Sequence, residues 1–406
     1  MDDRAQNNRV AGGSAPVTRY LVWAPGGRFG GCESYARSIA EFVRRSGWEV
    51  TILCSHRQTA DAFRERLPEA KIVLLTQFRL PVGLKGHERI MNLVESLRCG
   101  WYLLGHRPDI VHAALPWHIH SIGFVKSCTW LKLRALVTIQ LCAAGHVPGP
   151  HYIKAYRSAR DAGIRFGAIS EDNRRLLQNY YGLRAEEVPV IRNRPLLSSP
   201  PALDSATRSQ LRRSLDLADD QAMILTVGQF FRQKGYDLII RAIPEIVRRF
   251  PQVVFVWAGE GEERQQLEAL ADRVQVRDRI RMLGWRDDVP ALLRVADVFL
   301  FPTRYEGESF AVLEAVVAGV PVVASNASGI PELLRDGEDA LLFPVDDVEG
   351  LIAGVIAVLD QPAQAAARVQ RAKSRLDSYT HQNMLEDTLA LLQDVAQVSA
   401  GEGRLR

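Results

Sequence analysis

The stretch RYEGESFAVLEAVVAGVPVVAS, from Arg304 to Ser325, joins an acidic loop to a run of small apolar residues and then to a short apolar strand. Glu306 and Glu314 lie in it on either side of a helix start predicted at residues 307–310. Amide groups in the first turn of a helix attract phosphate, and carboxylates accept hydrogen bonds from hydroxyl groups. The stretch therefore predicts a loop-helix-strand unit of an α/β fold whose polar groups suit a sugar nucleotide.

The Glu-x7-Glu spacing of these two residues carries no information by itself. The same spacing separates Glu33 from Glu41, Glu41 from Glu49, and Glu260 from Glu268. The prediction rests instead on context, because the loop with Glu306 follows the apolar run 298–302 and precedes a helix. Ligands of parallel α/β sheets bind at this end of the strands.

Short apolar runs alternate with amphipathic stretches along the whole chain, the pattern of parallel sheets covered by helices on both faces. A polar, proline-containing segment at 198–211 divides the pattern into two series, and 406 residues exceed one ordinary core. We therefore predict an α/β protein with two doubly wound, Rossmann-like domains that face each other across a central cleft. The predicted strands lie at 19–25, 49–54, 70–75, 109–114, 134–139, 165–170 and 188–193, then at 223–228, 253–259, 279–284, 298–302, 320–325 and 340–344.

The pattern also predicts the limits of the domains. Residues 1–16 are polar and indicate a disordered lead-in, followed by a first domain at 17–200 and a second at 201–376. A C-terminal helix and tail occupy 377–406. The segment 379–397 is amphipathic, and it either caps the second domain or crosses back to the first.

The composition is that of a globular protein, with 47% hydrophobic and 24% charged residues. No apolar run approaches the roughly 18 residues that a membrane span needs. The cysteines are odd in number and form no Cys-x-x-Cys pair, which indicates free thiols in a reducing compartment and favours the cytoplasm. They are Cys32, Cys54, Cys99, Cys128 and Cys142.

Charge is unevenly distributed between the two halves. Residues 1–200 hold 28 Lys and Arg against 16 Asp and Glu, whereas residues 201–406 hold 23 against 31. This asymmetry indicates an anionic partner of the first half, such as a membrane surface, a phosphorylated acceptor or nucleic acid. The mixed basic and aromatic stretches 97–107 and 125–134 favour a membrane surface that the first domain meets together with its acceptor.

Two further segments carry groups that suit a phosphorylated ligand. The glycine-rich turn APGGRFGGCES follows the first predicted strand and allows close backbone approach at Gly30 and Gly31. In VGQFFRQKG, Lys234 lies between a strand end and a helix start, where it can neutralise a phosphate, and Arg232 can assist.

Several common catalytic motifs are absent from the sequence. It contains no Gly-x4-Gly-Lys-Ser/Thr, Gly-x-Ser-x-Gly or His-Glu-x-x-His motif. It also contains no Asp-x-Asp pair that would hold a diphosphate through a metal ion. We therefore expect neither a metal nor another cofactor.

The second half resembles the retaining glycosyltransferases of family GT4, which have the GT-B fold. The resemblance rests on VGQFFRQKGYDLIIRA, VWAGEGEERQQLEALA, the long segment from MLGWRDDVP to SGIPELL, and DALLFPVDD, which cover nearly all of the second domain in the family's order. The first domain is similar more weakly, through GGCESYARSIAEFVRRSGWEV, RPDIVHA, AISEDNRRLL and VIRNR.

The resemblance implies a role for each matching residue. Glu306 would contact the transferred sugar, Glu314 the nucleotide ribose, and Lys234 the diphosphate. Further residues would bind the donor: Gly30 and Gly31 from the first domain, and Gln229, Arg232, Glu308, Ser309 and Phe310 from the second.

The sequence departs from the family pattern in three places. Gln229 stands where an arginine is usual, so Arg232 would have to replace that cation. Arg194 follows Asn193 where the family has glycine. Ala114 occupies the place of a histidine, and His118 or His120 could supply that group. We take His118 as a catalytic candidate beside Glu306 and Lys234.

The resemblance implies a retaining glycosyltransferase with a UDP- or GDP-sugar donor and a hydroxyl acceptor, such as a lipid-linked one, in glycoconjugate or cell-envelope polysaccharide synthesis. It implies no nucleic acid partner and a cytoplasmic protein at the inner face of a membrane. Two other classes share the fold or tolerate the departures: a sugar-nucleotide epimerase and a catalytically silent binding protein.

Overall fold

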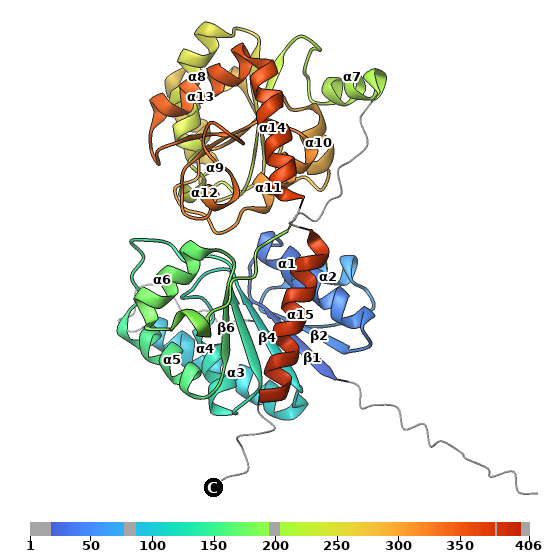
Figure 1. Ribbon diagram of the computed structural model, residues 1–406, viewed down its shortest axis with the longest axis vertical. Helices are drawn as coiled ribbons and strands as arrows, with labels where there is room; N and C mark the ends of the chain where they lie inside the picture. The colour runs from blue at the N-terminus through green and yellow to red at the C-terminus, as the bar shows by residue number, and fades with distance from the viewer. Residues whose placement is uncertain (1–17, 77–86, 195–203, 378–379, 399–406) are drawn as a thin grey trace, which may run out of the picture.

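A computed structural model describes residues 18–76, 87–194, 204–377 and 380–398. They form two α/β domains, one above the other in Figure 1, and the C-terminal helix lies on the lower, first domain. The predicted lead-in and the predicted boundary between residues 200 and 201 lie outside the described residues.

The first domain contains a parallel six-stranded sheet with the strand order β3-β2-β1-β4-β5-β6. Its central strands are buried on both faces, as expected for a sheet with helices on each side. The strands are β1 (Arg19–Ala24), β2 (Glu49–Cys54), β3 (Lys71–Leu74), β4 (Ile110–Leu115), β5 (Ala135–Ile139) and β6 (Arg165–Ala168).

The second domain repeats this topology with the order β12-β11-β10-β7-β8-β9, again all parallel. In each sheet the chain reverses its direction of strand addition once, between β1 and β4 and between β7 and β10. The prediction of two doubly wound sheets is confirmed. The strands are β7 (Ala222–Val227), β8 (Val253–Ala258), β9 (Ile280–Met282), β10 (Val298–Phe301), β11 (Val322–Ser325) and β12 (Leu341–Phe343).

Helices connect successive strands in both domains. Those of the first domain are α1 (Gly31–Arg45), α2 (Arg57–Arg66), α3 (His87–His106), α4 (Ile122–Trp130), α5 (Pro150–Asp161), α6 (Glu171–Tyr181) and the short η1 (Ala185–Glu187). Those that follow are α7 (Ser205–Ser214), η2 (Arg232–Lys234), α8 (Tyr236–Arg249), α9 (Arg264–Val274), η3 (Arg277–Arg279), α10 (Val289–Val295), α11 (Phe310–Ala318), α12 (Ile330–Leu333), α13 (Val348–Asp360), α14 (Pro362–Leu376) and α15 (His381–Val398).

One predicted strand is wrong. The apolar run 188–193 does not form a strand; Val190 makes an isolated bridge to Ala168 at the end of β6. Two backbone hydrogen bonds, from Ala168 N to Pro189 O and from Ile191 N to Ala168 O, hold it there. Pro189 has no N–H group to continue a ladder. The chain therefore leaves the sheet and runs towards the second domain.

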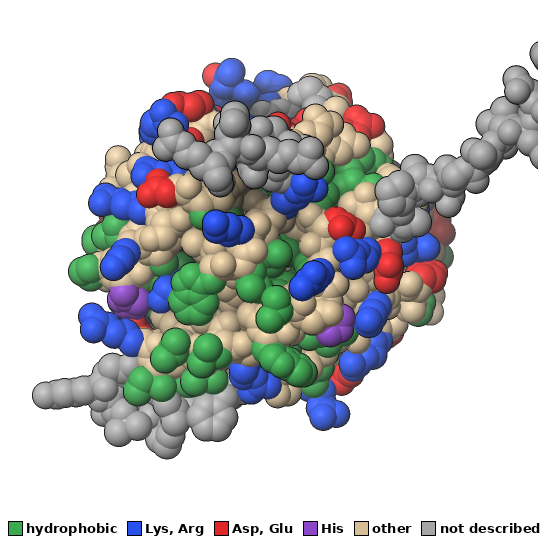
Figure 2. Space-filling model, turned by 90° about the horizontal axis from the view of Figure 1, so that it is seen from below, with side chains coloured by type: hydrophobic (Ala, Val, Ile, Leu, Met, Phe, Trp, Pro, Cys, Tyr) green, Lys and Arg blue, Asp and Glu red, His purple; other side chains and the backbone are tan. Residues whose placement is uncertain are grey.

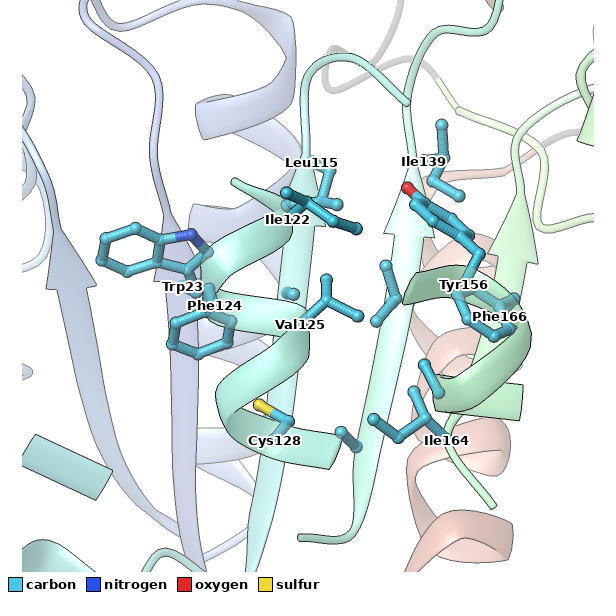
Figure 3. Packing of buried hydrophobic residues seen from close by; sticks show 14 of the residues in the cluster. Trp23, Leu115, Ile122, Phe124, Val125, Cys128, Ile139, Tyr156, Ile164 and Phe166 are labelled. Carbon is cyan, nitrogen blue, oxygen red and sulfur yellow. The ribbon is translucent and has the colours of Figure 1, made fainter. Parts of the chain in front are cut away.

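The core of the first domain lies between the sheet and α4, α5 and α6. Trp23 of β1 stacks on Phe124 of α4 with ring centroids 4.8 Å apart, and Tyr156 of α5 stacks on Phe166 of β6 (Figure 3). All four side chains are buried, and each contributes roughly 1.5–3 kcal/mol to stability through burial. This packing makes the sheet a rigid support for the loops at its carboxyl edge.

Helix α15 returns from the second domain to the first. Met384 and Leu392 belong to the core cluster that also contains Tyr35 of α1, and the Tyr35 hydroxyl lies 3.4 Å from Thr388 Oγ1. Figure 1 shows this red helix lying across the first domain. The described chain therefore passes between the domains twice, once after Arg194 and once between α14 and α15.

Among the described residues, no single helix is both long and apolar enough to cross a membrane. One pair of helical segments, Val348–Asp360 with Pro362–Gln397, passes the length and composition criteria together, with a bend of 103° between them.

Candidate active site

The candidate site of the second domain lies at the point where its sheet reverses. Lys234 follows β7 and Glu306 follows β10, and these two strands are neighbours. Parallel sheets bind ligands at this position. Gly235 makes the tight connection from η2 to α8: its φ is +68°, and a Cβ atom there would lie 2.0 Å from Pro302 O. Only glycine fits this close approach of the two loops.

Lys234 and Glu306 form an ion pair. Their side chains are 16% and 13% exposed, so the pair is largely sheltered from water. Lys234 Nζ also lies 5.0 Å from the centre of the Phe301 ring. The two residues therefore balance each other's charge in a site that is largely sheltered from water.

Two helix N-termini meet beside this pair, one from each domain. Helix α1 begins at Gly31, and a Cβ atom on Gly31 would lie 3.3 Å from the Phe310 ring at the start of α11. Ser309 caps α11 by accepting a hydrogen bond from Val312 N. The positive ends of both helix dipoles therefore lie close together, a favourable place for a diphosphate.

Glu33 holds the glycine-rich turn in shape. Its Oε2 accepts a hydrogen bond from Gly30 N at 3.0 Å, and a Cβ atom on Gly26 would overlap its Oε1. Burial raises the pKa of this carboxyl to about 7. The buried carboxyl group of Glu33 thus stabilises the turn with Gly30 and Gly31. The sequence analysis did not include this residue among the candidate site residues.

Glu314 lies one turn into α11. Its side chain is partly buried, and burial raises its pKa to about 7. No ion pair of Glu314 with a cation is present among the described residues. A neighbouring cation would lower this pKa, so burial alone accounts for the shift.

The loop with Glu306 touches the first domain directly. A Cβ atom on Gly307 would lie 2.2 Å from Gln140 O, beyond the end of β5, and one on Gly329 would lie 2.1 Å from Gly307 O. Three backbone segments therefore meet with almost no space between them. Glycine at 307 is required by this contact between the domains.

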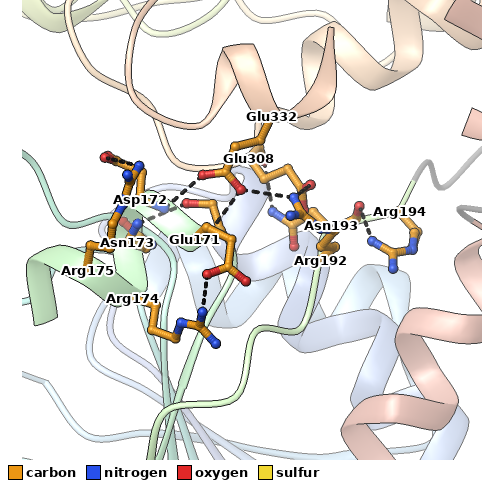
Figure 4. A network of polar contacts seen from close by, with 11 residues as sticks. Glu171, Asp172, Asn173, Arg174, Arg175, Arg192, Asn193, Arg194, Glu308 and Glu332 are labelled. Atoms are coloured by element: carbon orange, nitrogen blue, oxygen red, sulfur yellow. Dashed lines mark hydrogen bonds and ion pairs between the residues drawn. The ribbon is translucent and has the colours of Figure 1, made fainter. Parts of the chain in front are cut away.

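A polar network continues this interdomain contact (Figure 4). Glu332 of α12 accepts hydrogen bonds from the amides of Glu171 and Asp172, at 2.9 and 2.8 Å. It thereby caps helix α6 of the other domain. Arg192 Nη1 lies 3.1 Å from Glu332 and 3.3 Å from Glu308, and joins both carboxylates of the second domain to the first.

Glu308 lies in a different environment from the other predicted donor-binding residues. Its side chain is fully buried, pairs with Arg192, and its backbone oxygen accepts from Asn193 Nδ2 at 2.9 Å. Burial raises the pKa of Glu308 to about 8, although Arg192 and Arg194 oppose this shift. Its carboxyl group therefore serves the contact between the domains. We assign Glu308 a positioning role.

We expect Glu332→Ala to loosen the closed arrangement of the domains. The change removes two amide hydrogen bonds and the contact with Arg192, and hydrogen bonds to charged groups contribute about 1.5–3 kcal/mol. Small-angle scattering should give a larger radius of gyration, and turnover should fall about tenfold or more. Glu338→Ala, which removes an exposed carboxylate of the same domain, is the control. Unchanged scattering and turnover would contradict the proposed coupling.

The two candidate histidines differ in their surroundings. His118 is fully buried; its Nδ1 lies 2.7 Å from the Tyr181 hydroxyl, and burial lowers its pKa to about 4. His120 is partly exposed and interacts electrostatically with His56, whose ring borders the glycine-rich turn. Burial lowers the pKa of His120 to about 4 as well. His120 therefore lies closer to solvent and to the turn, whereas His118 anchors its own loop.

An aromatic cluster spans the two domains next to Glu306. Tyr305 lies 5.7 Å from Trp117 and 5.2 Å from His146, measured between ring centroids. Neither the cluster nor Arg192 and Glu332 was predicted from the sequence. The only available signal was the location of these residues at predicted strand ends and loops.

The residues at which the sequence departs from the family pattern differ in their exposure. Gln229 is partly exposed just after β7, and Arg232 is exposed at the first position of η2, two residues before Lys234. Arg194, in place of the usual glycine, is buried next to Glu308. Within the described ranges, no group of three or more His, Cys, Asp or Glu side chains could hold a metal ion.

Two sequence families of glycosyltransferases match this chain, one in each domain. Residues 207–375 match the sequence family "Glycosyl transferases group 1", and residues 29–193 match "Glycosyltransferase Family 4". The phosphatidyl-myo-inositol mannosyltransferase of Mycolicibacterium smegmatis is 31% identical over 364 residues, which is 86% of each chain. The chain belongs to glycosyltransferase family 4. The predicted family and the general activity of a glycosyltransferase are confirmed.

Other relatives of this family match over shorter ranges. The lipopolysaccharide core biosynthesis glycosyltransferase LpsE of Rhizobium meliloti is 34% identical over 144 residues, 36% of this chain and 41% of that protein. The chain thus spans less than half the length of several curated relatives that it matches.

Solved structures establish the fold independently. Anabaena Alr3699/HepE, solved in complex with UDP and glucose, superposes with a TM-score of 0.77 at 17% identity over 93% of this chain and the whole of that one. WaaG, a glycosyltransferase involved in lipopolysaccharide biosynthesis, gives a TM-score of 0.68 at 18% identity over 92% and 99% of the chains. The predicted GT-B fold is confirmed.

Proposed function

We propose that this family 4 glycosyltransferase transfers a sugar from a UDP- or GDP-sugar to a hydroxyl acceptor with retention of anomeric configuration. The proposal rests on one observation above the others: Lys234 and Glu306 meet at the reversal of the second sheet, beside the facing starts of α1 and α11. A cation and two helix N-termini suit the diphosphate, and carboxylates suit the sugar and the ribose.

The chemistry assigned to the site is loss of a nucleoside diphosphate from the sugar. As the bond to the anomeric carbon breaks, negative charge grows on the diphosphate, and Lys234 with the amides at Ser309 and Phe310 stabilises it. The acceptor hydroxyl attacks from the same face and passes its proton to the departing phosphate. Glu306 holds the sugar as positive charge builds on its ring. The closed domains keep water from competing as an acceptor.

For the acceptor, we propose a glycoconjugate or cell-envelope polysaccharide, in line with the names of LpsE and the mannosyltransferase. We assign the acceptor sugar to the cluster of Trp117, His146 and Tyr305 beside Glu306, and of the two candidate histidines His118 lies against this cluster, with its ring 5.1 Å from that of Trp117. The free thiols, four of them buried, favour a reducing compartment such as the cytoplasm.

Incubation of the purified protein with a panel of UDP- and GDP-sugars tests this proposal against its alternatives. Product transferred to an added glycan or glycolipid acceptor supports a glycosyltransferase. An epimerised sugar nucleotide without transfer would indicate an epimerase. Binding in a thermal shift assay without turnover would indicate a silent binding protein; a ligand at 100 times its Kd adds about 2.7 kcal/mol of stability.

We predict that nucleotide affinity rises with pH through the titration of Glu314. The ionised carboxylate accepts hydrogen bonds from both ribose hydroxyls, whereas the acid form offers one acceptor less. With its pKa raised to about 7 by burial, Glu314 should weaken nucleoside diphosphate binding as the pH falls through that value, by about tenfold or more in total before the effect levels off. Calorimetry from pH 5 to 9 measures this dependence in the wild type and in Glu314→Gln.

The variant Glu314→Gln should bind more weakly at high pH and should lose most of the pH dependence. Equal pH profiles of wild type and variant would place the titrating group elsewhere. The raised pKa of Glu314 also makes the free energy of unfolding depend on pH. Its contribution to stability is complete below pH 4.5, the ordinary pKa of a glutamate, and is lost as the pH rises through about 7.

A further inference from the structure

Helix α3 presents an unusual surface to solvent. Five large apolar side chains lie on one stripe along it with 3-4-4-3 spacing, so they share a face of the helix. Their exposed fractions reach 78% at Trp101 and 61% at Leu97, too high for a stripe that packs on a core. The members of this stripe, which we call the α3 stripe, are Ile90, Leu93, Leu97, Trp101 and Leu104.

The opposite face of α3 packs into the first domain. It holds the buried residues Ser96, Cys99, Tyr102 and Leu103 together with the partly buried Glu95. Glu95 Oε2 accepts a hydrogen bond from Gly123 N of α4 at 3.0 Å, and Ser127 Oγ donates to the backbone oxygen of Ser96 at 2.8 Å. A Cβ atom on Gly123 would lie 2.5 Å from Asn92 O, so the two helices pack closely through these groups. A helix that faces water normally exposes a polar face instead. The exposed face of α3 therefore suits an apolar environment.

Cations and a second tryptophan accompany the α3 stripe. Trp130 at the end of α4 is 57% exposed, one turn after Lys126, and Lys132 and Arg107 are exposed. Arg89 of α3 and Lys126 of α4 both lower the pKa of His151 through their charges, so both lie in the neighbourhood of that histidine. Figure 2 shows hydrophobic side chains gathered along one edge of the first domain, with Lys and Arg side chains bordering them.

We propose that the α3 stripe and Trp130 dock on the surface of an anionic lipid membrane. Apolar side chains along a helix enter the boundary between headgroups and acyl chains, tryptophan prefers that boundary, and surrounding cations pair with anionic headgroups. A second copy of the chain would bury the same apolar face but would bring like charges together, which disfavours it. The anionic bilayer satisfies both features.

Docking through the α3 stripe would bring the active site close to the membrane surface, where a lipid-linked acceptor lies; this consequence rests on the proposed function. Helix α3 begins after β3, at the same edge of the sheet as the glycine-rich turn, and runs away from it. A membrane along α3 therefore reaches the edge at which the two domains meet. A lipid-linked acceptor could enter the site from there without leaving the bilayer.

Flotation of the full-length protein with vesicles tests the proposal. We expect it to float with vesicles of equal parts phosphatidylcholine and phosphatidylglycerol, and not with phosphatidylcholine alone. Trp101→Ser and Leu97→Ser should each lower the partition coefficient about tenfold, because each removes a large buried side chain from the lipid. Trp285→Ser, at another exposed tryptophan in the second domain, is the matched control and should float as the wild type does.

Two measurements distinguish membrane docking from misfolding of the variants and from dimerisation through the α3 stripe. Melting temperature and nucleoside diphosphate affinity should be unchanged in the α3 variants, so failure of the proposed function and failure of membrane docking remain distinct. Light scattering after size exclusion reports a second copy: a wild-type dimer that Trp101→Ser dissociates would overturn the proposal. Absence of wild-type flotation, or normal flotation of Trp101→Ser, would overturn it as well.

Discussion

Glu306→Gln should lower turnover by about 10²- to 10³-fold, the typical effect of removing one electrostatic group of a preorganised site. The substitution keeps the shape of the side chain and removes the charge that faces the sugar as the bond to the diphosphate breaks. Affinity for the free nucleoside diphosphate should not fall. Because Glu306 neutralises Lys234 in the donor-free protein, its loss releases the lysine, and we expect equal or up to about tenfold tighter binding.

Single-turnover rates and calorimetry with the diphosphate check these two effects separately. Glu349→Gln, which changes an exposed carboxylate of the same domain, should behave as the wild type. If Glu306 only stabilises its loop, the variant would instead melt at a lower temperature, and its folded fraction would keep normal turnover. That result would remove Glu306 from the active site.

Local patterns in the sequence predicted the positions of Lys234 and Glu306 at neighbouring strand ends, because both lie in continuous segments; their roles towards a donor stay predictions. Lys234 follows the apolar run of β7, and Glu306 follows that of β10; a doubly wound sheet brings these two ends together. The neighbouring helix start at Phe310 was also readable, since Ser309 is a good N-cap residue. The predicted fold and the residue types at the strand ends therefore indicated the same location for the site.

The contacts between the domains could not be predicted from local sequence patterns. Arg192 and Glu308 are 116 positions apart in the sequence, and nothing local marks them as partners. The tight approach of Gly307 to Gln140 is likewise a property of the assembled domains. Glu308 thus looked like another donor-binding residue of an acidic loop, whereas its side chain is committed to Arg192.

Helix α3 shows a limit of periodicity alone, since only the mixed basic and aromatic character of residues 97–107 favoured a surface position for it. A stripe of apolar residues at helical spacing ordinarily predicts the buried face of a helix. Here a second apolar face, with Cys99, Tyr102 and Leu103, is buried in the core and packs closely on α4 at Gly123, so the stripe faces outward. Periodicity identifies the two faces of a helix, but only packing decides which one is buried.

Lys234→Met should be nearly as damaging as the change at Glu306, but in a different manner. It removes the positive charge beside the departing diphosphate and leaves the Glu306 carboxylate without its partner in the same place. Turnover should fall about 10²- to 10³-fold, and diphosphate affinity should fall as well, because the unpaired carboxylate repels the ligand. Lys373→Met, at the end of α14, is the control for loss of a lysine in this domain.

The double variant Lys234→Met/Glu306→Gln decides whether the two residues act on one ligand. With both charges absent, the repulsion is gone, so diphosphate affinity should recover to within about tenfold of the wild type and exceed that of Lys234→Met alone. Turnover should remain as low as in the single variants, since neither the leaving group nor the sugar is stabilised. Coupling of this kind is expected only for side chains in contact. A double variant that binds the diphosphate as weakly as Lys234→Met alone would mean that the Glu306 carboxylate does not act on the diphosphate site.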